Sequence, residues 1–355
     1  MDLPGFQIPR PSPHRLDSKW LPRRCPREQC PSHTQVPFAF QCKGRFSRKV
    51  DGRTVQRYKC LVCHNGFSSQ TFRLDYRLKK PWLPLAIFQA LVSKCSIRQA
   101  GRNLGSKPDT VLHHLGLLGE QGRQVHTAFL ERHKRDGPGL SGTFQLDELV
   151  TFEVDRRLQP LTMPVLMSKS TRFVVHADTG TLPAHGNLRE YDKQRKKAWE
   201  KAAGGKRVSR SKEATTTCFE VLRDHLGADA SFDVQTDEKK SYRLVLRQVF
   251  GKQIRHQWVN SKAVRNRANL LFPINNSLAQ TRDNLSRLVR RSWCHSKRER
   301  NLRLHLWVWI LYRNYVREIT NYNKRESSAS ALGVARRRLT ARELLQWKDA
   351  LPMAA

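Results

Sequence analysis

Hydrophobic and polar residues alternate with two different periods along this chain. Residues 82–118 carry apolar side chains at every third or fourth position, which is typical of helices that pack on one face. After residue 142 the pattern becomes strand-like in four segments: 143–154, 172–178, 230–237 and 254–259. Helices are predicted between and after these strands, over 214–226, 240–250, 276–293 and 300–322. This order predicts an α/β domain preceded by a small helical one.

The helical stretch has the pattern of a helix-turn-helix. After a first helix, a short helix is predicted from Ile97 to Leu104, a turn at Gly105 and a third helix that begins at Pro108. The apolar residues of the third helix are expected to face inward: Val111, Leu112, Leu115 and Leu118. Its polar residues are expected to face a DNA major groove: Lys107, Asp109, Thr110, His113 and His114. An ordinary three-helix core element would have the same pattern.

Composition shifts predict the domain boundaries. A flexible basic arm is expected over 1–24, a zinc ribbon over 25–75 and the helix-turn-helix domain over 76–136. Gly and Pro residues in 137–142 predict a linker. The catalytic domain then covers 143–325, with a basic surface insertion near 185–213, and a tail covers 326–355.

Charge narrows the class of partner. The 355 residues include 66 Lys and Arg against 30 Asp and Glu, a net charge of +36, and their 38% hydrophobic content supports real cores. Such an excess predicts a nucleic-acid partner rather than a membrane or a small-molecule substrate. The longest apolar run, 306–312, is too short to span a bilayer, and the N-terminal residues lack the apolar core of a secretory signal. A cytoplasmic, nucleoid-associated location is therefore expected.

The cysteines predict a structural metal site. Cys25 and Cys30 form one pair, and Cys60 and Cys63 form a second pair about thirty residues later. Two such pairs can supply four thiolates to a tetrahedral Zn²⁺, with the intervening segment forming a ribbon. Three nearby residues remain possible substitutes as ligands: Cys42, His33 and His64. The competing interpretation is a group of unrelated buried thiols.

Two aspartates are candidates for a catalytic site, one within a strand and one at a strand end, where metal ligands are common. Asp147 falls within the alternating strand 143–154, on the side that also carries Gln145, Thr151 and Glu153. Asp237 ends the strand 230–237, directly before a helix. Glu148 interrupts the apolar row of the first strand, which leaves open a bulge or a functional role. Taken singly, each aspartate also fits a helix cap or a turn.

The order of these modules resembles the insertion-sequence transposases that have an N-terminal zinc ribbon and a DDE catalytic domain. The resemblance covers roughly residues 25–320 and rests on CLVCHNGFS, the helix-turn-helix, the strand with Asp147 and Glu148, TDEKKSY, and INNSLAQTRDNLSRLVRRSW. It implies an RNase H-like fold, a mixed sheet flanked by helices with the acids gathered at one edge. It also implies two-metal phosphoryl transfer with Mg²⁺ or Mn²⁺, in which Asp147 is the first acid and Asp237 the second.

The third position of the family's set departs from the pattern. Counted back from Arg282, the usual Glu falls at Asn275. An amide oxygen is neutral, so it would hold a hard cation less tightly than a carboxylate would. Either the site works as an Asp-Asp-Asn set, or the chain is a catalytically impaired, transposase-derived DNA-binding protein. Three neighbours are possible stand-ins: Asn276, Asp283 and Glu299.

The end of the catalytic region predicts a phosphate channel. Residues 255–325 hold sixteen Lys and Arg against three acids. Four arginines flank the apolar residues of the predicted helix 276–293: Arg282, Arg287, Arg290 and Arg291. The expected partner is double-stranded DNA, both the element ends and the target. By analogy, a homodimer or a larger synaptic assembly is expected. A related nuclease that cuts without joining is a third hypothesis.

Overall fold

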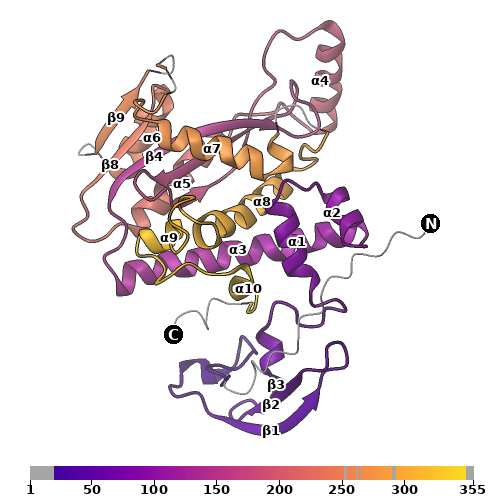
Figure 1. Ribbon diagram of the computed structural model, residues 1–355. Coiled ribbons are helices and arrows are strands. Elements are labelled where there is room, and N and C mark those ends of the chain that lie inside the picture. Colours follow the sequence, from indigo (N-terminus) through magenta and orange to yellow (C-terminus); the bar gives the residue numbers. More distant parts are fainter. Residues whose placement is uncertain (1–19, 252–253, 261–262, 265, 290–292, 349–355) are drawn as a thin grey trace. The chain divides into compact units, whose positions relative to one another are not determined.

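The computed structural model describes residues 20–251, 254–260, 263–264, 266–289 and 293–348 (Figure 1). Most of the predicted basic arm, residues 1–19, lies outside this description. The chain divides into two compact units. The first unit comprises residues 1–86 together with 345–355, and the second comprises 87–344.

The first unit is built on a three-stranded antiparallel sheet. Its strands follow chain order: β1 (Phe40–Ser47), β2 (Thr54–Cys60) and β3 (Gly66–Ser68). Two 3₁₀ turns, Pro31–Thr34 and Ser69–Phe72, precede and follow these strands. The core is small and largely aromatic, with Phe38, Tyr58 and Phe67 buried beside three of the cysteines. So few apolar side chains leave the unit dependent on other stabilising groups.

One such group is a carboxylate surrounded by arginines. Asp75 is buried and forms ion pairs with Arg48, Arg53 and Arg73 at 2.9–3.0 Å. Burial by itself would raise the pKa of Asp75, but Arg73, Arg48 and Arg53 outweigh it and lower that pKa to about 2. The cluster therefore stabilises the unit through a charge that persists at neutral pH.

The second unit contains a six-stranded mixed sheet. Its strands are β4 (Gly142–Phe152), β5 (Pro160–Ser168), β6 (Val174–Ala177), β7 (Gly180–Thr181), β8 (Phe232–Asp237) and β9 (Arg255–Val259). The order across the sheet is β6-β5-β4-β8-β9, and β7 pairs with β5. β5 runs antiparallel to β4 and to β6, whereas β8 pairs parallel with β4 and with β9. This is the strand order of the RNase H-like fold, so the predicted fold class is confirmed.

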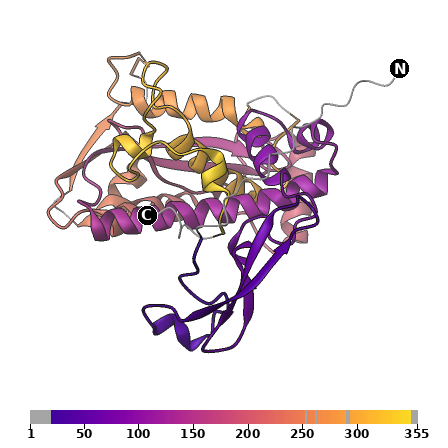
Figure 2. The same ribbon diagram turned by 60° about the horizontal axis from the view of Figure 1, so that its bottom comes forward.

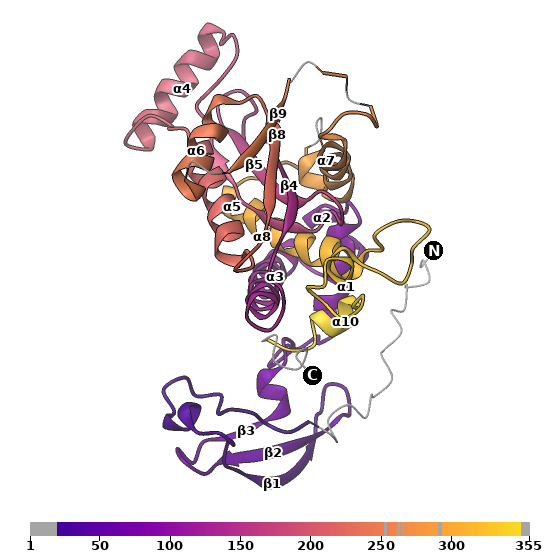
Figure 3. The same cartoon turned by 90° about the vertical axis from the view of Figure 1, so that its left-hand side faces the viewer.

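Helices cover both faces of this sheet. Figure 3 shows α5 (Ser211–His225) and α6 (Lys240–Phe250) on one side and α7 (Phe272–Asn284) on the other. The apolar residues at odd positions of β4 and β5 pack with α7 and α8 (Glu299–Leu311) in one core cluster. The remaining helices are α1 (Leu83–Val92), α2 (Ile97–Asn103), α3 (Pro108–Asp136), α4 (Glu190–Ala202), α9 (Ser328–Ala331) and α10 (Ala341–Leu344).

Two of the predicted helices have different bounds in the structure. The helix predicted over 276–293 begins at Phe272, with Pro273 in its first turn. It ends at Asn284 because Leu285 is extended, and a 3₁₀ turn follows. The helix predicted over 300–322 leaves α-helical geometry after Leu311 and continues as one π-helical turn.

The long helix α3, which Figure 2 shows in magenta, packs closely on α8. The contact depends on two glycines of α3, Gly119 and Gly122. A Cβ atom on either would lie 2.7 Å from a backbone oxygen of α8, that of Leu304 or Trp307. Trp307 and Trp309 of α8 are buried in the core. None of the helices in the described residues combines the length and the apolar character needed to cross a membrane.

Candidate metal centre and candidate active site

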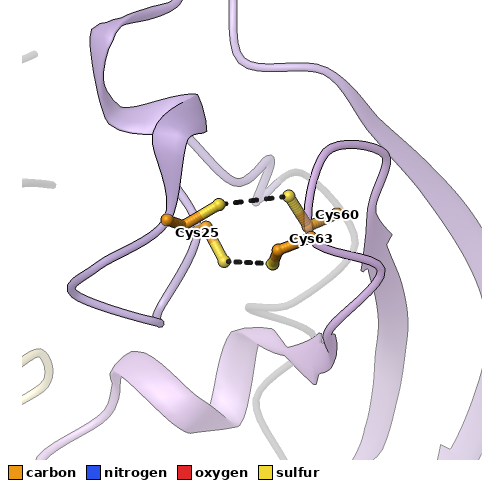
Figure 4. A group of neighbouring side chains, drawn as sticks. Cys25, Cys60 and Cys63 are labelled. Atoms are coloured by element: carbon orange, nitrogen blue, oxygen red, sulfur yellow. Dashed lines mark hydrogen bonds between the residues drawn. The ribbon is translucent and has the colours of Figure 1, made fainter.

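The four predicted cysteine ligands come together in the first unit. The sulfur atoms of Cys25, Cys30, Cys60 and Cys63 all lie within 4.8 Å of one another. Figure 4 shows Cys25, Cys60 and Cys63 pointing toward one another from two loops. The Sγ atoms of Cys25 and Cys63 are 3.5 Å apart, and those of Cys30 and Cys60 are 3.8 Å apart. These separations exceed a disulfide bond but fit thiolates about 2.3 Å from one tetrahedral ion, which lie about 3.8 Å apart.

The surroundings of these thiols favour thiolates on one side of the cluster. The hydroxyl of Ser32, 3.0 Å from the sulfur of Cys30, lowers the pKa of Cys30 to about 6. Burial raises the pKa of Cys25 to about 12, so in the absence of a cation that thiol stays protonated. Two of the possible substitute ligands are occupied or remote: His33 bonds the backbone oxygen of Cys25, and Cys42 is exposed on β1.

Asp147 and Asp237 occupy matching positions on neighbouring parallel strands. The pairing of β4 with β8 extends to Gln145, which lies opposite Gln235. Asp147 and Asp237 each lie two residues further along, and β8 ends at Asp237. Residues in register on adjacent parallel strands face the same side, with about 4.8 Å between the strands. The two aspartates therefore come to the same face and the same level of the sheet.

A ladder of glutamines fixes this register. Gln145 Nε2 donates to Gln235 Oε1 at 2.9 Å, and Gln235 Nε2 donates to Gln257 Oε1 at 2.9 Å. Gln145 and Gln235 are almost completely buried. Sequence reasoning missed this function, although the signal was present, because Gln-x-Asp occurs at 145–147 and again at 235–237.

Gln145 also anchors the helix that carries the third predicted position. Its Oε1 accepts from the backbone N–H of Ile274 at 3.1 Å, and its Nε2 donates to the backbone oxygen of Leu270 at 2.7 Å. Asn275 follows Ile274 in the first turn of α7 and is half-buried. The start of α7 thus lies two residues, about 7 Å, from Asp147 along the strand direction.

The stand-ins for Asn275 are engaged elsewhere. Asn276 Oδ1 accepts from Arg172 at 2.6 Å, in the loop between β5 and β6. Asp283 pairs with Lys94 at 2.7 Å, where both side chains are exposed. Glu299 accepts from Thr179 and pairs with Arg303, at the start of α8. Asn275 remains the third position of the candidate site.

Glu148 lies on the opposite face of β4 and organises the elements beneath the aspartates. The register of β4 with β5 is continuous through Glu148, so the suggested bulge is absent from this strand. Its side chain is 10% exposed. The partners of its carboxylate come from three elements: Thr162 of β5, Ser211 and Thr215 of α5, and Lys239 and Tyr242 at the start of α6.

Tyr242 contacts Glu148 and also lies in the electrostatic field of the two aspartates. Its hydroxyl donates to Glu148 at 2.9 Å. Burial raises the pKa of Tyr242 far above its ordinary value, and the charges of Glu148, Asp237 and Asp147 raise it further. The Tyr242 hydroxyl therefore stays protonated and donates to Glu148. On the other side, the backbone N–H of Lys239 donates to Asp237 Oδ1 at 3.1 Å and orients that carboxylate.

The predicted recognition helix differs from expectation at two positions. α2 ends at Asn103, Gly105 has a positive φ of 55° and Pro108 starts α3, as the sequence indicates. However, Leu112 is exposed and His114 is buried, the reverse of the predicted arrangement. Burial lowers the pKa of His114 to about 4. The remaining predicted DNA contacts on this helix stay at least partly accessible: Lys107, Thr110 and His113.

The predicted arginine row is also changed. Arg287 is buried, donates to His305 Nδ1 at 2.9 Å and to Ser296 Oγ at 3.1 Å, and burial lowers its pKa to about 10. It points inward because the helix ends at Asn284 and the following 3₁₀ turn is packed into the core. Arg282 is half-buried. Arg290 and Arg291 lie outside the described residues.

Comparisons with known proteins give few matches. No family model matches the chain, and no curated protein sequence does. The catalytic domain of Mos1 transposase with raltegravir and Mg is 12% identical over 54% of this chain and 81% of that one, at a TM-score of 0.25. A pre-cleavage Mos1 transpososome is 11% identical over 63% and 75%, at 0.18. The catalytic domain of Mos1 mariner transposase is 11% identical over 55% and 90%, at 0.21. TM-scores this low do not establish structural similarity, so the fold is assigned from the strand order alone.

Proposed function

We propose that this chain is a DNA transposase that cleaves and transfers strands at the ends of its own element. The observation that supports this function best is the alignment of Asp147 and Asp237 on adjacent parallel strands of an RNase H-like sheet. Two carboxylates on adjacent strands are suited to a hard divalent cation, Mg²⁺ or Mn²⁺. When bound, such ions activate the attacking oxygen and stabilise the leaving oxygen of a phosphodiester.

The protein's own residues hold this site in place. Gln145 ties β4 to β8 and to the first turn of α7. Glu148 ties β4 to α5 and α6 from below. In this proposal both are positioning residues, since neither would touch the substrate.

Asn275 completes the set with a neutral amide oxygen. Such a ligand holds Mg²⁺ more weakly than Glu would, so higher metal concentrations are needed. The same asparagine favours the second candidate function, a catalytically impaired DNA-binding protein descended from a transposase.

The four thiols of the first unit are proposed to hold a structural Zn²⁺. Their mutual distances and their cysteine-only composition suit a closed tetrahedral site. The proposed role of the ion is to stabilise the small ribbon rather than to take part in catalysis.

Double-stranded DNA is the proposed partner because the net charge is +36. α4 adds a helix without a buried residue that carries Lys193, Arg195, Lys196, Lys197 and Lys201. This surface is suited to phosphate contact without base recognition. Two DNA ends must be held together for transfer, so we propose an assembly of at least two copies.

The test is a cleavage and joining assay on DNA that carries the gene's own flanking sequences, with Mg²⁺ or Mn²⁺. Nicking at the element boundary that is lost in Asp147→Ala, with DNA binding retained, would support the proposal. Asp233→Ala is the matched control, because Asp233 lies on the same face of β8 at its opposite end. Binding without nicking, restored by Asn275→Asp, would favour the DNA-binding descendant. Nicking without joining would favour a nuclease.

A further inference from the structure

A small open cavity lies beside the outer strand of the sheet, away from the aspartates' face. Its volume is about 250 Å³. It is lined by Arg243, Leu246 and Arg247 of α6, and by Ile254, His256 and Trp258 from β9 and the residue before it. That volume is below the roughly 300–1,000 Å³ of enclosed small-molecule sites, so it suits one part of a longer ligand.

Two arginines of α6 give this cavity one positively charged wall. Arg243 and Arg247 are four residues apart, so they share one face of α6. Within the described residues neither guanidinium has an acidic partner, and neither α6 nor β9 contains an Asp or Glu. Like charges at this spacing destabilise an isolated helix slightly. An anionic ligand would offset that repulsion.

Trp258 gives the cavity an exposed aromatic wall. Its side chain is 62% exposed, although the strand beside it, β8, is buried at Val234, Gln235 and Thr236. The next ring, His256, is half-buried, and its Nε2 lies 2.9 Å from Thr236 Oγ1. Leu246 forms an apolar floor. An exposed aromatic ring beside guanidiniums that have no acidic partner among the described residues is suited to an unpaired nucleotide, with the base stacked and the phosphate paired.

We propose that this cavity binds one unpaired nucleotide of a single DNA strand, with its base on Trp258 and its phosphate on Arg243 and Arg247. Trp258 lies opposite Thr236, which directly precedes Asp237. The cavity therefore lies at the edge strand β9, next to the strand that carries Asp237, on the opposite face of the sheet. A strand separated from its complement near the aspartates could reach it.

The experiment measures binding of the full chain to a labelled thymidine single strand and to a duplex of the same length. We expect Trp258→Ala to weaken single-strand binding about 5- to 150-fold, with little effect on the duplex. Trp258→Phe should retain most of the affinity. Leu244→Ala is the matched control, because Leu244 is 61% exposed on the same helix but does not line the cavity.

Charge is tested separately through salt dependence. Replacing Arg243 and Arg247 by Gln should reduce the slope of log affinity against log salt by about 0.7 for each phosphate that the protein no longer neutralises. Unchanged single-strand affinity in Trp258→Ala, or an equal loss for single strand and duplex, would overturn the proposal. Because these are binding measurements, their failure leaves the cleavage proposal standing, and a failure of cleavage leaves this one standing.

Discussion

The two units of this protein are stabilised in different ways. The first has a thin aromatic core supplemented by a four-thiol cluster and by one carboxylate among three arginines. The second buries long apolar rows between a sheet and its helices, and some of its buried polar residues, such as Gln145, Gln235 and Glu148, hold the candidate site together. If the thiols hold the proposed metal, the small unit replaces apolar volume with metal ligands and charge, whereas the large one uses buried polar groups to position a candidate site.

The largest expected effect is that of removing the proposed structural metal from the first unit. Structural zinc sites contribute about 10–16 kcal/mol of apparent binding free energy, more than a small domain's own stability. A chelator, or Cys60→Ser, should therefore unfold the first unit and leave the second folded. Hydrogen exchange would show fast exchange in residues 40–68 and unchanged protection in β4 and β5.

Cys42→Ser is the control for this experiment, because Cys42 is exposed in the same sheet. Unchanged exchange in 40–68 after chelation would contradict a structural metal. Equal loss of protection in both units would contradict their independence.

The next effect concerns the buried hub of the second unit. Glu148→Ala leaves hydroxyls and the Lys239 ammonium without their acceptor, so the free energy of unfolding should fall by about 2–4 kcal/mol. Glu148→Gln keeps the shape and should cost less. The denaturant midpoints of the second unit measure the stability of both variants. An unchanged midpoint in Glu148→Ala would contradict a stabilising role of Glu148.

Gln145 tests the link between geometry and activity. Gln145→Leu removes the bonds to Gln235, Leu270 and Ile274, so strand cleavage should fall about 10- to 100-fold, as for other groups that orient metal ligands. Raising the Mg²⁺ concentration should restore part of this loss, which a purely structural role would not allow. The control is Gln257→Leu, at the exposed end of the ladder.

A smaller effect follows from the low pKa of Asp75. Because the folded pKa, about 2, lies below the ordinary value of 3.8, the ionised form stabilises the folded state above pH 3.8. This contribution, about 2 kcal/mol, should disappear as the pH falls from about 4 to 2. Subtracting the pH profile of Asp75→Asn from that of the wild type isolates it. A difference that stays constant through this range would contradict the charge cluster.

The sequence predicts four of the six strands of the sheet, but it misses the short β7 and the central strand β5. All nine residues of β5 are buried, and a strand buried on both faces shows no alternation of apolar and polar residues. The faces of the predicted elements also differ in part from expectation. Alternation in 143–154 places Asp147 on the side of Gln145, and the structure agrees. That side was expected to be polar, yet α7 and α8 cover it, because the coverage depends on segments more than a hundred residues away. Packing between segments this distant in the chain cannot be predicted from the alternation of apolar and polar residues within one strand.

Long-range packing also explains why the predicted burial was wrong at three helix residues. Leu112 and His114 are both next to core positions, and the packing of α3 within the second unit decides which of them is buried. Arg287 looked accessible only while the helix was expected to continue to residue 293. The register of the candidate site could be predicted from the sequence. Gln-x-Asp occurs at 145–147 and at 235–237, so pairing the two glutamines on parallel strands also pairs the two aspartates.

The central claim is that Asp147 and Asp237 bind one divalent cation. Crystals of the protein with Mn²⁺ and DNA, measured at the manganese absorption edge, test it directly. We predict an anomalous peak at coordination distance from both carboxylates, and its loss in Asp147→Asn. The claim would be contradicted if the protein nicks DNA in solution but its crystals show manganese elsewhere and none beside these aspartates.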